Sequence, residues 1–284
     1  MSLNSINTNN NASIALQSLN ATSSALQATE KKISTGYRVA DATDDGAAYA
    51  VAQQVRSDVG ALTTANQQLG SAKGLVSTTI SSLNDVSNKL GEVRQTLLDL
   101  SSTTSDATTR NTNIGKYKSQ IAEIKSDLQK SNYVGKTLVG DIAGSKGTYG
   151  SVGVAEDEFG SNFNVAATSG TALFNALSTL SASLTNAAGA LAAISTGGVF
   201  TAKATGVTTA LATYGAASNH LDAQQTFNNN NKIDALNTGL GALVDADLTK
   251  ESAKLQALQV RQQLATQSLS IANQAPQSLL SLFK

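Results

Sequence analysis

Cysteine is absent from the 284-residue sequence, which excludes disulfide frameworks, thiolate zinc sites and cysteine nucleophiles. A single histidine, His220, leaves no two-histidine metal motif. Tryptophan is also absent and aromatic residues make up only 4% of the chain, so a compact aromatic-packed core is not expected. The single proline, Pro276, permits very long helices. Together these shortages favour thin helices that pack through small interfaces.

Charged residues are also scarce, at 14% of the chain where about 25% is usual. The Lys and Arg residues, 20 in number, balance 20 Asp and Glu residues, which argues against a general nucleic-acid-binding protein. The N-terminus has neither the positive segment nor the apolar run of a secretory signal, and no stretch approaches ~18 consecutive apolar residues. We therefore expect no membrane insertion. A cytoplasmic protein, or one whose uncleaved N-terminus is read by a dedicated secretion machine, would have this sequence character.

The two ends of the chain are long and uncharged, yet they carry regularly spaced aliphatic residues. The first charged side chain is Glu30, and after Arg261 the only one is Lys284. Periods of seven residues, typical of coiled coils, run through Leu19, Leu26 and Ile33, through Leu258, Ala265, Ala272 and Leu279, and through Leu248, Leu255 and Leu269. Ordering ~40 residues costs about 40–80 kcal/mol, whereas burying the aliphatic side chains of the N-terminal end returns only ~10–20 kcal/mol. We expect the ends to pack on each other or on other subunits.

The strongest period lies between residues 55 and 97. It is formed by residues seven apart without a break: Val55, Leu62, Leu69, Val76, Leu83, Leu90 and Leu97. A second row of mostly small or apolar residues follows three positions after each, which completes the seam of a coiled coil. This pattern predicts one helix from about residue 44 to 100. We expect Asp44 and Asp45 in its first turn, where the helix dipole favours acids, and Gly36 at the end of the preceding helix.

Beyond residue 100 the pattern changes several times. A Ser/Thr loop over 101–106 and a helix through 114–128, returning antiparallel, are followed by Gly-rich hairpins and loops over 132–170. We then expect one amphipathic helix over 177–194 and a last helical region over about 203–239. The predicted fold is mainly α: long antiparallel coiled-coil helices formed by both termini and a rod domain, with a small middle insertion of β-hairpins, loops and helix.

No catalytic, cofactor-binding or metal-binding motif stands out, so we predict no enzyme and no cofactor. The sequence contains no phosphate-binding glycine loop, and the acidic cluster of Asp41, Asp44 and Asp45 lacks the spacing of a calcium loop. We interpret the acidic run Glu156–Glu158 as a solvated loop and His220 as a surface or interface residue. The run of asparagines at 228–231 is a weak point or a subunit contact, and the sequence does not decide between the two.

Two stretches resemble bacterial flagellin. The first is S-T-G-Y-R-V at 34–39 followed by A-T-D-D-G-A-A at 42–48, similar to the family's S-S-G-x-R-I-N-x-A-x-D-D-A-A-G. The second is V-D-A-D at 244–247 and I-A-N-Q-A-P-Q-S-L-L-S-L at 271–282, similar to the family ending of D-A-D followed by A-N-Q-x-P-Q-x-x-L-S-L. The resemblance covers about residues 1–140 and 203–284. One departure is Gly46, which replaces the usual first alanine and weakens the helix start by up to ~1 kcal/mol.

This resemblance implies a subunit that polymerises into the flagellar filament for swimming motility, with itself and with other flagellins. It implies five segments: an N-terminal inner-tube helix (1–40), the rod domain (41–139 and 203–243), a variable outer region (140–202) and a C-terminal inner-tube helix (244–284). The aliphatic rows of both ends would form the assembly interface, and Arg38, Asp44 and Asp45 would lie in the tube–rod link. An export chaperone at the C-terminal helix, the flagellar secretion apparatus, and cap and junction proteins would be partners, and the product would be extracellular.

Alternatives and one further expectation accompany the resemblance. A hook–filament junction protein shares the terminal heptads, although both motifs above favour flagellin. A metallopeptidase-bearing flagellin needs two histidines, and a pore-forming translocator needs an apolar segment, so neither is expected. In many flagellins an innate-immune toll-like receptor binds a run resembling L-Q-R-I-R-E-L. In this chain Glu92 occupies the position of the first arginine of that run, and Arg94 occupies the position of the second. Gln95 and Thr96 replace its glutamate and leucine. We therefore expect weak receptor activation.

Overall fold

The computed structural model describes the backbone of residues 9–281 and the side chains of residues 9–274. The chain forms two compact units, a terminal unit (Met1–Ser57 and Ala235–Lys284) and a central unit (Asp58–Asp234). No helix in the described range is long and apolar enough to cross a bilayer. Most of the chain is helical, as predicted, with four short strands between α3 and α4.

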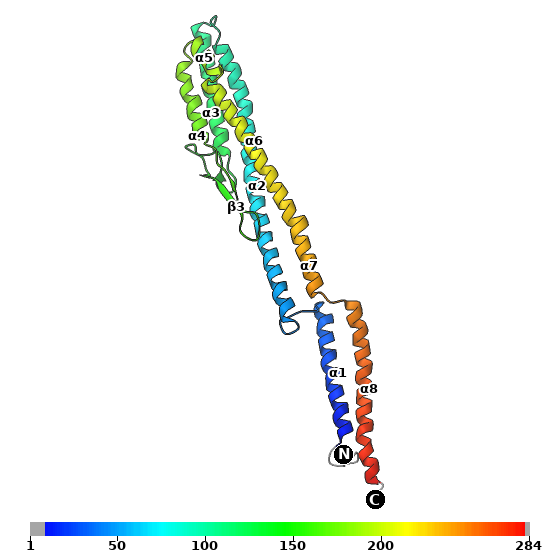
Figure 1. Cartoon of the computed structure of the whole chain (residues 1–284). Helices are drawn as coiled ribbons and strands as arrows, with labels where there is room; N and C mark the ends of the chain where they lie inside the picture. Colours follow the sequence, from blue (N-terminus) through cyan, green and yellow to red (C-terminus); the bar gives the residue numbers. More distant parts are fainter. Residues whose placement is uncertain (1–8, 282–284) are drawn as a thin grey trace. The chain divides into compact units, whose positions relative to one another are not determined.

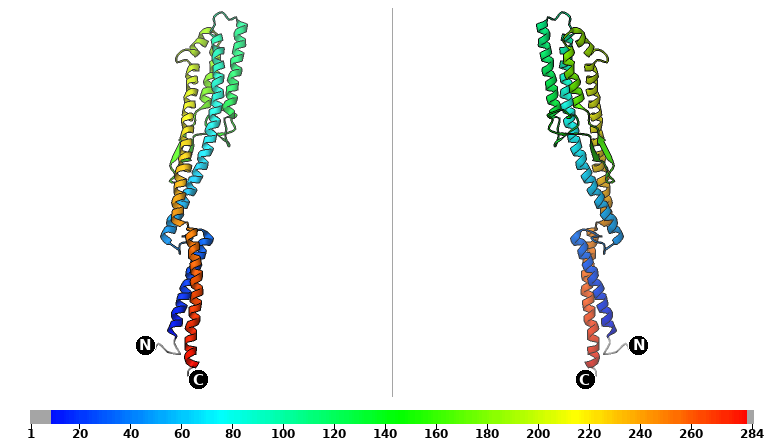
Figure 2. Two further views of the ribbon diagram at one scale, coloured as in Figure 1. Left: turned by 90° about the vertical axis from the view of Figure 1, so that its right-hand side faces the viewer. Right: turned by 90° about the vertical axis from the view of Figure 1, so that its left-hand side faces the viewer.

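The terminal unit is built from two long helices that lie side by side in Figures 1 and 2, α1 (Asn10–Thr35) and α8 (Leu248–Ser281). Asn9 caps the start of α1, since its side chain accepts a hydrogen bond from the Ala12 amide at 3.0 Å. Gly36 ends α1 with a φ of 75°, which confirms the predicted glycine cap. The start of α2 (Gly46–Leu100) and α7 (Asp234–Val244) complete the unit, where Val39, Ala52 and Val244 form a small buried cluster.

The central unit is an antiparallel helix bundle formed by the rest of α2 with α3 (Ala107–Lys130), α4 (Gly170–Leu180), α5 (Ala187–Ile194) and α6 (Val199–Thr226). Two contacts fix the antiparallel pairing of α2 with α3: a hydrogen bond from Thr96 to the Gln120 side chain, and an ion pair between Lys89 and Glu123. Pairing of α2 with α6 is fixed by an ion pair between Lys73 and Asp222. The core is one continuous hydrophobic cluster that includes buried Tyr117 and Tyr214, whose hydroxyls bond to the Leu177 carbonyl and to Thr168.

Three expectations about element boundaries are wrong. Asp44 and Asp45 precede α2 and are not in its first turn, because the Asp45 carboxylate caps the helix from outside by accepting from the Ala47 and Ala48 amides. The single helix expected over 177–194 is two helices, α4 and α5, joined by a 3₁₀ turn (η1, Ser181–Ser183), because Asn186 caps a new start. The last helical region is interrupted by a π-helix, η2 (Phe227–Ile233).

The strands form two small sheets in the Gly-rich segment. β1 (Lys136–Thr137) and β2 (Thr148–Tyr149) pair in parallel, whereas β3 (Val152–Ala155) and β4 (Asn162–Val165) form an antiparallel hairpin in which Val152 lies opposite Val165. The hairpin is tied to α2 by a hydrogen bond of 3.2 Å from the Ala155 amide to the Gln68 side chain. Its turn, over residues 156–161, therefore lies beside the helices of the central unit.

A tight turn before β1 places a valine in a strained conformation. Tyr133 and Lys136 exchange backbone hydrogen bonds of 2.8 and 3.0 Å, and the central residues Val134 and Gly135 have φ values of 48° and 74°. Such turns favour Asn-Gly, because a β-branched residue at positive φ costs about 1–2 kcal/mol. Val134 is also 85% exposed, so its side chain gains little burial in return.

We therefore expect Val134→Asn to stabilise the monomer by about 1 kcal/mol, because asparagine adopts this conformation at lower cost. Urea unfolding followed by circular dichroism measures the change. Val51→Asn is the matched control, because Val51 is also exposed but lies within a helix, where asparagine is not favoured. An unchanged or lower unfolding midpoint for Val134→Asn would show that the turn is not strained.

Candidate assembly surfaces

The two terminal helices pack antiparallel in a register fixed at both ends. The Asn9 side chain donates to the Ala272 carbonyl at 2.8 Å, and Lys32 lies 3.9 Å from the Glu251 carboxylate. The residues of α8 that lose exposure to α1 form one heptad seam, here called the inner row: Glu251, Leu255, Leu258, Gln262, Ala265, Leu269 and Ala272. Leu255, Leu258, Ala265, Leu269 and Ala272, which the sequence predicted for assembly, all lie in this row. Leu248, at the start of α8, is 49% exposed, and the side chain of Leu279 falls outside the described residues.

The facing row of α1 consists of Ala12, Ala15, Leu19, Thr22, Leu26, Thr29 and Ile33. The predicted assembly residues Leu19, Leu26 and Ile33 are half-buried in it, whereas Thr22 and Thr29 are the buried ones, at 5% and 0% exposure. Thr22 bonds to the carbonyl of Ser18 within its own helix. The heptad pattern of apolar residues did not reveal the row formed by Ala15, Thr22 and Thr29, because two of its three members are threonine.

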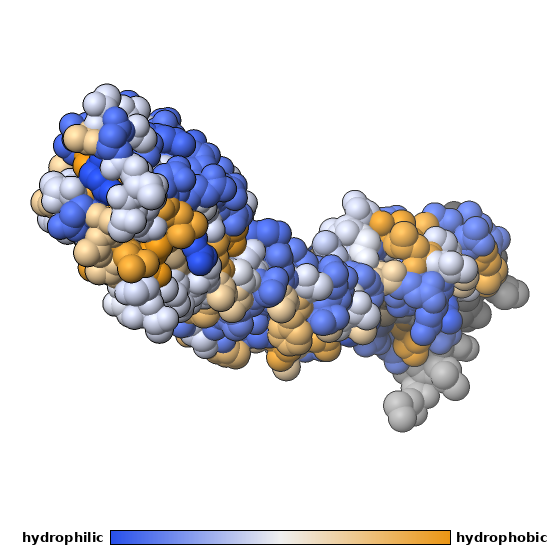
Figure 3. Space-filling view, turned by 90° about the horizontal axis from the view of Figure 1, so that it is seen from above, coloured by the Kyte–Doolittle hydropathy of each residue, from blue (hydrophilic) through white to orange (hydrophobic). Residues whose placement is uncertain are grey.

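The predicted assembly residues therefore meet within one chain. A different set of apolar side chains is left on the opposite face of α8: Val260 is 55% exposed, Leu264 62% and Ile271 61%. At about 100° per residue these three lie within about 40° of one another and roughly 160° from the inner row. We call them the outer row. On the face of the molecule shown in Figure 3, hydrophobic side chains gather in separate patches between hydrophilic ones.

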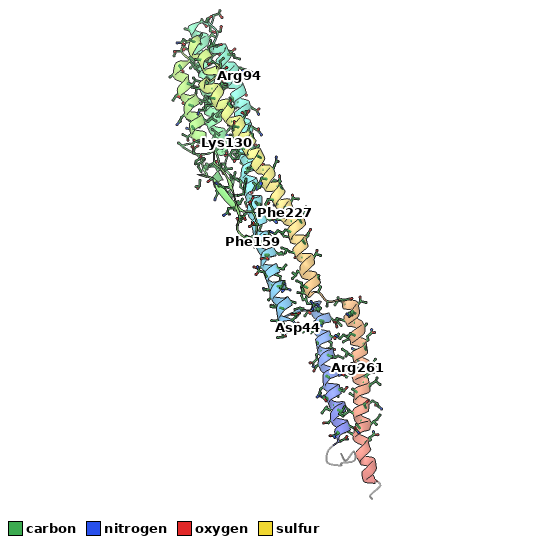
Figure 4. The ribbon with its side chains drawn as sticks, in the orientation of Figure 1. Asp44, Arg94, Lys130, Phe159, Phe227 and Arg261 are labelled. Atoms are coloured by element: carbon green, nitrogen blue, oxygen red, sulfur yellow. The ribbon has the colours of Figure 1, made fainter. Side chains whose placement is uncertain are left out.

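The predicted tube–rod link is organised by charge and by backbone hydrogen bonds. Lys31 pairs with Asp41 at 2.6 Å and with Asp44 at 3.0 Å, and these contacts hold the pKa values of both carboxyls below their usual range. Asp44, labelled in Figure 4, also accepts from the Ala40 amide at 3.0 Å. Its carboxylate thus ties the chain between α1 and α2 into a fixed turn.

Arg38 joins the N-terminal and C-terminal halves of the terminal unit. Its amide donates to the Val244 carbonyl at 2.7 Å, and its guanidinium contacts the Leu243 carbonyl. Nearby, the Ala246 amide donates to the Gly36 carbonyl at 2.9 Å. The two stretches that carry the resemblance, around residues 36–39 and 243–246, are therefore in direct contact, although about 200 residues separate them in sequence.

The predicted rod seam is almost entirely buried. Leu62, Leu69, Val76, Leu83, Leu90 and Leu97 are each 4% exposed or less, while Val55 is half-buried in the terminal unit. Their heptad partners from Ala65 to Leu100 are buried as well. From Leu69 onward the apolar residues of both rows belong to the core cluster that also includes residues of α3 and α6. They therefore stabilise the subunit and leave little apolar surface for a partner.

Of the four residues that align with the receptor-binding run of other flagellins, three are exposed and one is buried. Glu92, Arg94 and Gln95 face solvent, and Arg94 is labelled in Figure 4. Glu92 lies 3.3 Å from Lys89, which also pairs with Glu123 at 2.8 Å, and these two carboxylates raise the Lys89 pKa. Thr96 is fully buried and donates to the Gln120 side chain at 3.0 Å. Position 96 therefore belongs to the interior of the bundle.

The acidic run at 156–158 is not the solvated loop that the sequence suggested. The Glu158 side chain is only 6% exposed and pairs with Lys232, and Glu156 lies 2.5 Å from the Nε2 atom of His220. The β3–β4 turn brings both carboxylates onto α6 and η2, which local sequence did not predict. His220 is half-exposed and packs against the Phe163 ring at 4.3 Å between centroids.

Comparison with known proteins agrees with the motifs at both ends. A model of the bacterial flagellin N-terminal helical region matches residues 6–140, and one of the C-terminal helical region matches residues 198–283. Flagellin FljM of Caulobacter vibrioides is 35% identical over the full length of both chains. A flagellin of Brucella melitensis is 36% identical over 99% of each chain, and flagellin C of Rhizobium meliloti is 31% identical over 99% of this chain and 100% of its own.

Each of these relatives is named a flagellin, so the hook–filament junction protein considered above is not favoured. Flagellins are structural proteins and not enzymes. The family models cover most of the chain, and the three relatives named above are each more than 30% identical to it and match it over nearly its whole length. The chain therefore belongs to the bacterial flagellin family, as a structural subunit of the flagellar filament.

Proposed function

We propose that this flagellin joins its filament through the outer row of α8, with the α1–α8 pair acting as a preassembled unit. The observation that carries the proposal is the pair of opposed rows on one helix. The inner row is covered by α1, whereas Val260, Leu264 and Ile271 remain exposed. Large exposed apolar side chains in a row favour burial against another protein, and the flagellin family supplies copies of itself as the partner.

The uncharged character of this region supports the same proposal. No charged residue occurs between residues 262 and 283, and none occurs before Glu30. A surface without charge loses little hydration energy when it is buried deep in an assembly, whereas a buried unpaired charge costs several kcal/mol. Both terminal helices are therefore suited to the interior of a polymer.

The five-segment division, with inner-tube helices at 1–40 and 244–284 and an outer region at 140–202, is part of this proposal. We also propose that the protein is secreted by the flagellar secretion apparatus and assembles outside the cell beneath a cap and beyond junction proteins. An export chaperone covering the outer row of α8 before secretion would prevent premature polymerisation. The exposure of Leu264 and Ile271 supports such a partner, because an uncovered apolar row promotes association.

Seeded polymerisation tests the assembly function directly. Purified chain added to short filament fragments should extend them into filaments visible by electron microscopy. The soluble fraction after sedimentation should fall as protein concentration rises above a threshold. A chain that stays monomeric in the presence of seeds, at concentrations where another flagellin polymerises, would contradict the proposal.

We further propose that this flagellin activates the toll-like receptor weakly, because Glu92 and Gln95 reverse or remove charges on the exposed side of α2. Thr96 takes no part in receptor binding under this proposal, because it is buried against Gln120. Arginine is a frequent anchor at interfaces, and an acid in its place adds repulsion to a partner's acidic groups.

In a receptor-reporter cell assay, we expect the Glu92→Arg, Gln95→Glu double variant to lower the half-maximal concentration by at least about tenfold, which corresponds to about 1.4 kcal/mol. Thr96 is left unchanged, so that the bundle interior is not disturbed. The control is the Lys116→Glu variant, which alters charge on α3, outside the run. Strong activation by the natural chain, equal to that of a flagellin with the complete run, would refute the idea.

A further inference from the structure

The π-helix η2 lies between α6 and α7 and interrupts what is otherwise a continuous helical path. π-Helical turns are rare, accommodate one more residue than an α-helical turn, and frequently occur at functional sites. Here the π-helical segment is seven residues long, from Phe227 to Ile233. It includes the four asparagines whose role the sequence left open.

The spacing of apolar residues explains why the helix must accommodate one extra residue between Leu221 and Ile233. The buried row of α6 ends in Ala217 and Leu221. The next large apolar residue that is not exposed is Ile233, twelve positions after Leu221, since Phe227 between them is 49% exposed. In an uninterrupted α-helix these two side chains would be about 120° apart. A π-helical turn takes up one residue, or about 100°, and returns half-buried Ile233 to the face of Leu221.

The turn of the β3–β4 hairpin contacts η2 near both of its ends. Near the start, the fully buried Asn228 side chain donates to the Glu156 carbonyl at 2.7 Å, and Gln224 donates to the same oxygen at 3.2 Å. Near the end, Lys232 donates to the Glu158 carboxylate at 2.5 Å. Phe159 of this turn and Phe227, the first residue of η2, are both labelled in Figure 4.

The hairpin turn has a fixed shape of its own. Asp157 accepts hydrogen bonds from the Ser161 hydroxyl at 2.6 Å and from the Phe159 amide at 3.0 Å. These bonds lower the Asp157 pKa, with the Ser161 contact as the largest cause. The turn therefore holds the Glu156 carbonyl and the Glu158 carboxylate at a fixed distance from each other. Asn228 and Lys232 can reach both groups at once only in the positions that the π-helix gives them.

We propose that the β3–β4 turn is a register latch, which keeps residues 227–233 π-helical by holding Asn228 and Lys232 at the same time. If the segment became α-helical, residues near its start would move little. Lys232, near its end, would rotate by up to about 100° away from Glu158. Such a change would leave the nearly buried Glu158 carboxylate without its partner, which is unfavourable.

The latch has a consequence for the helix that follows. α7 starts at Asp234, directly after η2. Whether residues 227–233 are π-helical or α-helical therefore sets the rotation of α7 about the helix axis relative to the residues before η2. Release of the hairpin is therefore expected to loosen α7, whose backbone continues directly from η2.

Hydrogen exchange by mass spectrometry on the full-length monomer tests this link through α7 peptides. We expect Glu158→Gln to speed amide exchange in residues 234–244 at least ~10-fold. In a chain that also lacks the exposed Asn230, the same substitution should have less than a ~3-fold effect, because a continuous α-helix then has the correct phase without the latch. Lys232→Gln should behave like Glu158→Gln and replaces it if that variant does not fold.

Glu123→Gln is the matched control, because it removes another carboxylate of the central unit that pairs with a lysine, and it should leave α7 exchange unchanged. Equal acceleration of α7 with and without Asn230 would show that Glu158 only stabilises the unit, which overturns the latch. No acceleration in either background would overturn it as well. A loss of helical circular dichroism on deletion of Asn230 alone would also contradict it, since that deletion should restore a regular helix.

Discussion

Replacing Leu264 with aspartate should abolish filament growth while the monomer stays folded. Leu264 is 62% exposed in the subunit and lies on the side of α8 opposite to α1, so a carboxylate there disturbs nothing inside the chain. In the filament the same carboxylate would be buried without a partner, at a cost of several kcal/mol in every subunit. Sedimentation after seeding and electron microscopy measure assembly, and circular dichroism measures folding.

Gln259→Asp is the matched control, because Gln259 is exposed on the same helix but lies outside both the inner and the outer row. It introduces the same charge and should polymerise close to normally. Two further substitutions, Leu26→Asp and Leu269→Asp, place the same charge in the rows through which α1 and α8 face each other. We expect those two to act earlier, by separating α1 from α8, so they should reduce the helical signal of the monomer. Normal filaments from Leu264→Asp would remove the outer row from the interface.

Truncating Leu97 to alanine should lower the stability of the central unit by about 2–5 kcal/mol, because it deletes a fully buried side chain and leaves a cavity in the bundle. For a unit of this size each kcal/mol lowers the melting temperature by about 2–4 °C, so a decrease of about 10 °C is expected. Thermal and urea unfolding followed by circular dichroism measure the effect.

The adjacent Leu98 provides the comparison, because it has the same side chain on the same helix but is 51% exposed. Leu98→Ala should change stability by no more than about 0.5 kcal/mol. Equal effects of the two substitutions would show that the heptad seam does not carry the stability of the bundle.

Much of the fold follows from local sequence alone. The unbroken heptads from Leu62 to Leu97 predicted the long helix α2, because a repeat of seven keeps one face apolar along many turns. Gly36 ends α1 as predicted, because glycine adopts the positive φ of a helix cap without strain. The end motifs identified the family, and the comparisons confirm it.

The candidate surfaces were predicted less well, because burial depends on which element arrives from elsewhere in the chain. Leu258 and Leu269 have the pattern of an interface, but only the pairing with α1 shows that the same chain covers them. Thr96 belongs to the run that the resemblance assigns to receptor binding, although the position of α3 buries it against Gln120. A heptad repeat indicates that one face of a helix is buried. It does not indicate whether the helix that buries it belongs to the same chain or to another subunit.

Sequence by itself determined the helical periods, the uncharged ends, the absence of cysteine and the family. Tertiary structure alone decided which apolar row of α8 stays free, why Glu158 is buried, and how the asparagine run is folded. The physical reason is the range of the interactions involved. Caps and heptads act within one or two helical turns, whereas the contacts of Glu158 with Lys232 and of Asn9 with Ala272 join residues 74 and 263 positions apart.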